Sequence, residues 1–279
     1  MLGRDVVDTL GEGPVWSGAG ARLYWVDILA PAINLLDAAG NVQRWPMPER
    51  VGWVVERAAG GLLAGFKSGI AALDPDTRAI EYWCAVEPDR QHNRLNDAKV
   101  DRQGRLWFGS KDDRDLEASG AFYRMDAARV PVRVDDDYIV TNGPCFSPDG
   151  QWLYHTDSGR RLIYRFALAE DGTLGARATF VRFEEEWGYP DGMTTDAEGC
   201  LWVAHWGGGR ISRFDPDGRR MTSITLPAQN ITSCAFGGSS LDRLYVTSAA
   251  LNSPRESGDG ALFIVDAGVR GLPAALYVG

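Results

Sequence analysis

Residues 141–154 read TNGPCFSPDGQWLY, and the pattern in this stretch recurs along the whole chain. Asn142 stands eight positions before Gly150, which ends a polar turn, and an apolar run with two aromatic residues follows. The same offset occurs six times, and equivalent residues of a repeat occupy equivalent places in the fold. The six pairs are Glu12 and Gly20, Gly52 and Gly60, Asn96 and Gly104, Asn142 and Gly150, Asp191 and Gly199, and Thr232 and Ser240.

The length of the repeat indicates the fold. Successive marked residues lie between 40 positions (12 to 52) and 49 positions (142 to 191) apart, which suits one four-stranded propeller blade. The segments around each turn are rich in Tyr, Trp, Val and Ile and are bounded by Gly, Asp and Pro, as strands are. We therefore predict an all-β, six-bladed β-propeller as a single domain of residues 1–279. A two-sheet sandwich with a similar number of strands does not explain the recurring offset.

Connectivity then predicts one functional face. The loop leading into the first strand of a blade lies on the same face as the loop between its second and third strands. Glu12, Asn96, Asn142 and Asp191 should therefore converge on the axis at that face. The run 5–10 is expected to close the ring as an outer strand of the last blade. Loops between second and third strands are expected at residues 111–119, 157–160, 205–209 and 251–259.

Composition excludes some partners. The chain has 279 residues, 44% of them hydrophobic, and a net charge of −9, which argues against nucleic acid or an anionic membrane as a partner. The four cysteines are scattered without a CxxC pair, as expected for buried thiols in a reducing compartment. The N-terminus lacks a signal-like apolar run, and no stretch of about 18 apolar residues exists. We expect a cytoplasmic protein that is a monomer, because a propeller protects its strand edges internally.

Three of the marked residues form a candidate metal site. Glu12, Asn142 and Asp191 offer only oxygen atoms, which suit Ca²⁺, Mg²⁺ or Mn²⁺, with Zn²⁺ possible. Three protein ligands around a channel would leave positions for water and substrate. Asn-Gly and Asp-Gly pairs are also frequent turn formers, so turn capping is the alternative. Gly52 and Thr232, which carry no ligand, are interpreted as the open side where the substrate enters.

Other residues on this face are candidates for substrate contact. Arg94 and Asn96 place a fork-shaped cation and an amide beside the axis, although Arg94 could instead pair with Asp97 or Glu87. No HxH or HExxH spacing exists among the three histidines, and His205 is the best of them for contacting substrate. A G-x-S-x-G nucleophile elbow is absent from the sequence, which argues against serine catalysis.

Several motifs resemble the regucalcin/gluconolactonase family, also known as the senescence marker protein family. The resemblance spans essentially the whole chain, with its motifs in the family's order. The motifs are LGEGPVW at 10–16, RLNDAKVD at 94–101, TNG at 141–143, YPDG at 189–192 and TSCAFGG at 232–238.

The resemblance implies a six-bladed propeller that hydrolyses a sugar lactone, an aldonolactone of five or six carbons, with one divalent cation: Ca²⁺, Mg²⁺, Mn²⁺, Zn²⁺ or Fe²⁺. By position, Glu12, Asn142 and Asp191 match the metal ligands, and Asp191 also matches the general base. Substrate-binding residues of the family match Arg94, Asn96 and Glu117, with Asp113 and Asp115 as alternatives to Glu117. Two other readings stay open: a non-catalytic, Ca²⁺-binding regulatory propeller, and a hydrolase of phosphotriesters or lipid-like lactones on the same face.

Overall fold

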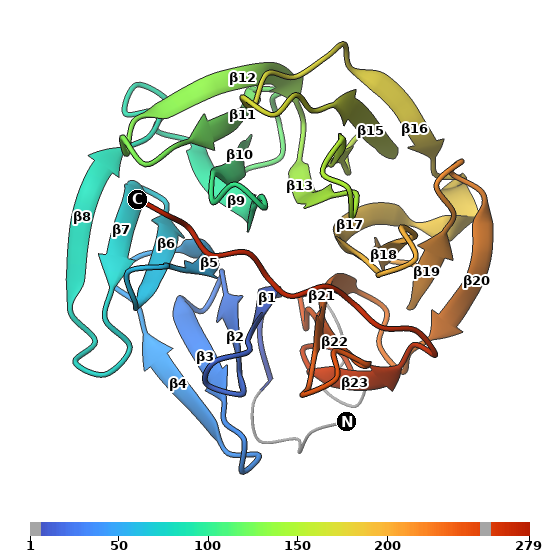
Figure 1. The fold of residues 1–279 in the computed structure, drawn as a ribbon, viewed down its shortest axis with the longest axis horizontal. Coiled ribbons are helices and arrows are strands. Elements are labelled where there is room, and N and C mark those ends of the chain that lie inside the picture. The colour runs from blue at the N-terminus through green and yellow to red at the C-terminus, as the bar shows by residue number, and fades with distance from the viewer. Residues whose placement is uncertain (1–6, 252–257) are drawn as a thin grey trace.

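The strands form six separate antiparallel sheets arranged in a ring, as Figure 1 shows for the computed structural model. The structure describes residues 7–251 and 258–279. Five sheets have four strands and the last has three, in sequence order from the axis outward. The predicted six-bladed β-propeller is confirmed. Within the described residues, no helix is long and apolar enough to cross a membrane.

Each blade is one run of consecutive strands. The first three blades contain β1 (Gly11–Ser17), β2 (Arg22–Asp27), β3 (Ala32–Leu36) and β4 (Val42–Pro46); β5 (Val51–Glu56), β6 (Leu62–Phe66), β7 (Gly69–Leu73) and β8 (Ile80–Ala85); and β9 (Asn93–Val100), β10 (Leu106–Asp112), β11 (Gly120–Met125) and β12 (Pro131–Tyr138). The last three contain β13 (Thr141–Phe146), β14 (Trp152–Asp157), β15 (Leu162–Ala167) and β16 (Ala178–Arg182); β17 (Tyr189–Thr195), β18 (Leu201–Trp206), β19 (Arg210–Phe214) and β20 (Arg220–Thr225); and β21 (Ile231–Gly237), β22 (Arg243–Ser248) and β23 (Phe263–Asp266). A short 3₁₀ helix, η1 (Glu185–Trp187), precedes the fifth blade.

The ring closes through its innermost strands. Each first strand contacts the first strand of the next blade, and β21 of the last blade contacts β1 of the first. Residues 5–10 were predicted to form an outer strand of the last blade. Residues 5 and 6 lie outside the described residues, and residues 7–10 form no strand. Asp8 nevertheless bonds to the last blade, because its amide donates to Gly260 (2.9 Å) and its carbonyl accepts from Ala250 (3.1 Å).

The offset of eight has a conformational cause in the turn between the first and second strands. Gly60, Gly104, Gly150 and Gly199 all have φ between 72° and 90°, the left-handed region that glycine adopts without a steric penalty. In the first and last blades the left-handed residue comes one position later, at Ala21 and Leu241. In the second to fifth blades, the marked glycine therefore reverses the chain direction, on the face opposite the marked ligands.

Packing between blades is made by the second strands, which are buried on both sides. Trp107 and Trp202 occupy equivalent positions in β10 and β18 and have no exposed surface. Their indole nitrogens donate to Asp101 (2.8 Å) and Asp196 (2.9 Å), five residues after the marked positions. Each aspartate thus satisfies a buried donor that its blade would otherwise leave unpaired.

The C-terminal segment crosses the central opening on the turn side of the ring (Figure 1). The carbonyl of Arg270 accepts from the amide of Ala197 in the fifth blade (2.8 Å). The amide of Tyr277 donates to Glu56 in the second blade (2.9 Å), and that of Val278 donates to Gly104 in the third (3.2 Å). Residues 272–275 line a cavity of about 180 Å³ in the channel beneath this segment. The segment covers the turn side, so the approach to the marked residues is from the other face.

Candidate metal centre and substrate site

A β-bulge interrupts each blade at the marked residue. A bulge leaves a residue out of the ladder and changes the direction of its side chain, which here lets ligand groups face the axis instead of a neighbouring blade. Gly13 (φ 51°) and Gly143 (φ 41°) supply the unusual backbone directly after Glu12 and Asn142. Register shifts fall between Glu12 and Val15, Val51 and Trp53, Asn142 and Cys145, Pro190 and Met193, Ile231 and Ser233, and, on the second strand of the third blade, Phe108 and Ser110.

The structure brings the three candidate metal ligands together. Glu12, Asn142 and Asp191 are each exposed by only 4–5%. The negative charge of Asp191 contributes to raising the pKa of Glu12, after the larger effect of burial. A Cβ atom on Gly143, next to Asn142, would lie 3.3 Å from the backbone carbonyl of Asp191. Glu12 and Asp191 are therefore close enough for their charges to interact, and the bulge next to Asn142 lies against Asp191.

The electrostatics of this site fit a bound cation. Burial, and then the charge of Asp97, raises the pKa of Asp191 well above its ordinary value. The Oδ1 atom of Asp191 is buried and has no hydrogen-bond partner among the described residues. Buried carboxylates without partners are costly, and a divalent cation would compensate two of them at once. Among the described residues, no group of three or more His, Cys, Asp or Glu side chains could hold a metal ion. The candidate set here consists of two carboxylates and the amide of Asn142.

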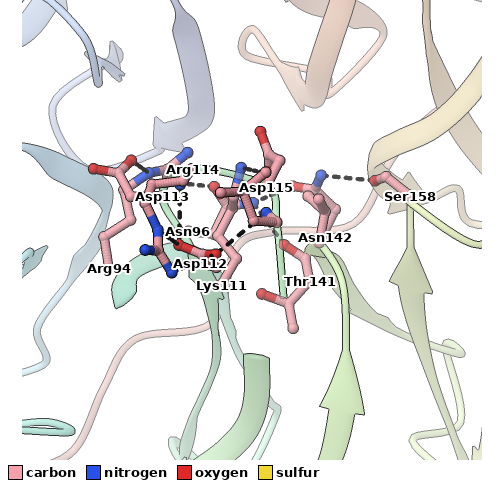
Figure 2. A network of polar contacts seen from close by, with 12 residues as sticks. Arg94, Asn96, Lys111, Asp112, Asp113, Arg114, Asp115, Thr141, Asn142 and Ser158 are labelled. Atoms are coloured by element: carbon pink, nitrogen blue, oxygen red, sulfur yellow. Dashed lines mark hydrogen bonds and ion pairs between the residues drawn. The ribbon is translucent and has the colours of Figure 1, made fainter. Parts of the chain in front are cut away.

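Neighbouring residues fix the orientation of the Asn142 amide. Its Nδ2 atom donates to the Ser158 hydroxyl (2.9 Å), and its Oδ1 atom accepts from Nδ2 of Asn96 (2.9 Å), as Figure 2 shows. The second lone pair of Oδ1 is then available for a cation. The Asp97 carboxylate accepts from the amide of Gly143 (2.6 Å) and so ties the bulge of the fourth blade to the third.

Arg94 and Asn96 lie directly beside the candidate ligands. The Arg94 guanidinium donates to the Asn96 side-chain oxygen and, through Nε, to Oδ1 of Asp113 (2.8 Å). The ion pair of Arg94 is therefore with Asp113, whereas sequence reasoning considered Asp97 and Glu87. Arg94, Asn96 and Asn142 form one continuous hydrogen-bonded path along the face of the site (Figure 2).

The structure does not bring Glu117 to this path. Its side chain is 68% exposed and pairs with Arg114 (3.2 Å) in the loop after β10. Of the two alternatives, Asp113 contacts Arg94, and Asp115 pairs with Lys111. A role for Glu117 in substrate binding stays a prediction. Asp113 lies beside Arg94, one of the predicted substrate-binding residues.

Sequence reasoning missed Lys111. Its side chain is 7% exposed, and burial, followed by repulsion from Arg94, lowers its pKa to about 8. The available signal was its position at the end of β10, fifteen residues after Asn96, where the strand reaches the functional face.

Three expectations about neighbouring residues were wrong. A Cβ atom on Gly52 would lie 2.4 Å from the Leu95 carbonyl, so this glycine allows two first strands to approach rather than substrate to enter. Thr232 is fully buried and donates to the Gly11 carbonyl. His205 is also fully buried, with Nδ1 2.8 Å from the Trp187 carbonyl, so it cannot contact substrate on the surface of the site. Of the four predicted loops, residues 252–257 of the last lie outside the described part.

Comparison with known proteins agrees with this architecture. The sequence model of the SMP-30/Gluconolactonase/LRE-like region matches residues 10–250. The chain belongs to this family. It is 38% identical to a 6-deoxy-6-sulfogluconolactonase of Pseudomonas putida, covering 97% of this chain and 95% of that protein. It is 35% identical to a pentonolactonase of Haloferax volcanii, with 96% and 95% covered.

A solved structure shows the same fold over nearly the full length. The calcium-binding protein regucalcin from Agrobacterium tumefaciens superposes with a TM-score of 0.93 at 28% identity, covering 97% of this chain and 94% of that one. The resemblance noted in the sequence motifs is thereby confirmed at the level of family and fold.

Proposed function

We propose that this protein hydrolyses sugar lactones, specifically aldonolactones of five or six carbons, to the corresponding acids with the help of one divalent cation. The observation that carries the proposal is the buried, unpartnered Oδ1 atom of Asp191 beside Glu12 and Asn142. Family relatives named as sulfogluconolactonase and pentonolactonase support the reaction class.

Glu12, Asn142 and Asp191 would hold the cation. When bound, a divalent cation polarises the lactone carbonyl and offsets the negative charge that develops on its oxygen. Two carboxylates balance the two positive charges, and the neutral amide adds an oxygen without adding charge. The oxygen set alone does not distinguish Ca²⁺, Mg²⁺, Mn²⁺, Zn²⁺ and Fe²⁺.

Asp191 is assigned the proton transfers. A carboxylate oxygen of Asp191 takes a proton from the water whose oxygen adds to the carbonyl carbon. The bond between this carbon and the ring oxygen then breaks, and the proton passes from Asp191 to the ring oxygen, which becomes a hydroxyl. The atoms of lactone and water are thus recovered in one hydroxy acid.

Arg94 and Asn96 orient the sugar. The guanidinium and the amide are held in place by Asp113 and by the Thr141 carbonyl, to which Asn96 donates (2.6 Å). Preorganised groups of this kind hold hydroxyls without a further loss of side-chain freedom, so the carbonyl carbon stays near the attacking water.

The second candidate is a non-catalytic calcium-binding propeller. It is favoured by the solved relative described as a calcium-binding protein. The two functions share the same ligands and differ only in whether a lactone is turned over, so one assay separates them.

The test is a pH-indicator assay of five- and six-carbon lactones with metal-stripped protein, before and after adding each divalent cation. We expect hydrolysis that depends on added metal and falls by about 10²–10⁴ in Asp191→Asn, the range lost when a general base is removed. Asp217→Asn is the matched control, because Asp217 is 77% exposed and pairs only with Arg219 on the described surface. Metal binding without turnover of any lactone would favour the second candidate.

A further inference from the structure

Four cationic side chains gather at one side of the candidate site. Arg50 directly precedes β5, Lys67 lies in the turn between β6 and β7, and Arg94 and Lys111 lie on β9 and β10. These segments belong to the second and third blades and reach the functional face. The charge of Arg50 acts on Arg94, and the charge of Arg94 acts on Lys111, so these three form one electrostatic group. Lys67 joins the group through its ion pair with Asp113.

Two carboxylates form ion pairs with these four cations. Asp113 accepts hydrogen bonds from Arg50 and from Arg94 (2.8 Å) and forms an ion pair with Lys67 (3.9 Å), so three cations share it. Asp115 pairs with Lys111. The four cations therefore have only these two carboxylates as ion-pair partners in the described structure.

Nearby carboxylates are already engaged elsewhere. Asp112 and Glu117 both pair with Arg114, at 3.0 and 3.2 Å. Glu49 accepts from the Ser68 amide (2.9 Å) and the Tyr82 hydroxyl (3.0 Å). None of the three forms an ion pair with the four cations in the described structure.

Lys111 is the cation whose carboxylate partner is least buried. Its side chain is 7% exposed, yet its partner, Asp115, is 56% exposed. A buried ammonium group with a largely exposed partner is suited to bind an anionic group of a ligand.

The order of contacts gives the site a direction. From Asn142 the hydrogen bonds lead to Asn96, then to Arg94, then to Asp113, where Arg50 and Lys67 converge. In Figure 2, Asn142 and Ser158 lie at one end of this network and Arg94 and Asp113 at the other. A lactone with its carbonyl at the metal ligands would extend its remaining carbons toward the cations.

We propose that Arg50, Lys67 and Lys111 bind an oxyanion carried at the end of the substrate remote from the carbonyl, so that this protein prefers anionic sugar lactones. The inference rests on the proposed function, because it assigns the carbonyl end of the substrate to Glu12, Asn142 and Asp191. Phosphate, sulfonate and carboxylate share the required chemistry, since each accepts several charge-assisted hydrogen bonds.

The experiment compares kcat/KM for D-glucono-1,5-lactone with that for its 6-phosphate, its 6-deoxy-6-sulfo analogue and D-glucaro-1,4-lactone. We expect at least one anionic lactone to exceed the neutral lactone by about tenfold or more, and the preferred arm identifies the anion. In Lys67→Met and Arg50→Gln this ratio should fall several-fold, mainly through KM, and added KCl should reduce it in the wild type. Arg219→Gln removes an equal charge from an exposed side chain and should leave the ratio unchanged.

A ratio near one in the wild type, or an unchanged ratio in both variants, would overturn the inference while leaving lactone hydrolysis intact. If no lactone is hydrolysed, the proposed function fails, and the preference for an anionic group is then tested by ligand binding alone. Calorimetry should then show tighter binding of D-gluconate 6-phosphate than of D-gluconate, with the difference lost in Lys67→Met. Equal binding of the two acids would overturn it.

Discussion

His155 makes the folded protein sensitive to acid. Its ring has no exposed surface and lies stacked on Phe122 (centroids 3.9 Å apart), with the Tyr138 ring edge-on at 4.7 Å. Neither ring nitrogen has a hydrogen-bond partner among the described residues. Burial lowers the pKa of His155 from 6.5 to about 3, because an imidazolium there would lose its hydration without gaining an acceptor.

The size of the effect follows from proton linkage. Below pH 6.5 the unfolded chain binds a proton at this histidine, whereas the folded chain does not until about pH 3. The unfolding free energy is therefore lost as pH falls from 6.5 toward 3, by about 1.4 kcal/mol for each pH unit. At pH 5 the loss from His155 alone is about 2 kcal/mol, a substantial part of the 5–15 kcal/mol typical of folded domains.

Urea unfolding of wild type and His155→Phe at pH 8 and pH 5 measures this contribution. The drop in unfolding free energy between the two pH values should be about 2 kcal/mol smaller in the variant, because phenylalanine cannot bind the proton. His92→Phe is the matched control, since His92 is exposed, and its drop should equal that of the wild type. An equal fall in unfolding free energy in the wild type and in His155→Phe would show that His155 does not cause the sensitivity to acid.

Three further predictions concern the site and its support. In metal-stripped protein, Glu12→Gln should raise the melting temperature, because it removes a buried carboxylate that is repelled by those of Asp191 and Asp97. It should also abolish the stabilisation by a cation at 100 times its Kd, about 2.7 kcal/mol in the wild type. Asp196→Ala should lower the unfolding free energy by about 3–5 kcal/mol in urea titrations, because this fully buried carboxylate accepts from an arginine and a tryptophan. The preference for anionic lactones should fall as pH rises through about 8, where Lys111 loses its charge, and the pH profile of the kcat/KM ratio should flatten in Lys111→Met.

The repeat was readable from sequence because four of the six turns have a left-handed glycine eight residues after the marked position. A left-handed glycine such as Gly150 tolerates few replacements, and the bulge at Asn142 lies at a constant distance from it. That regularity predicted six blades, which the structure confirms, and it predicted that Glu12, Asn142 and Asp191 lie near one axis, where all three side chains are buried.

Features outside the repeat were not predictable in the same way. The loop after β10 has no counterpart of equal length in the other blades, so nothing in the repeat indicated that Asp113 faces Arg94 while Glu117 faces solvent. Glycine at position 52 reflects a close contact with Leu95 on another blade, and such contacts leave no local pattern. His205 was predicted to contact substrate because the repeat indicates which face of the ring it lies on. The repeat does not indicate that its side chain is fully buried.

If a cation held by Glu12, Asn142 and Asp191 is required for lactone hydrolysis, the initial rate should depend on that cation. Metal-stripped protein is titrated with a divalent cation while hydrolysis of a preferred lactone is followed. We expect a rate near background without metal and a rise to a plateau at one cation per chain, with no such rise in Glu12→Gln. Full activity in the metal-stripped protein, or an equal plateau in Glu12→Gln, would contradict this requirement.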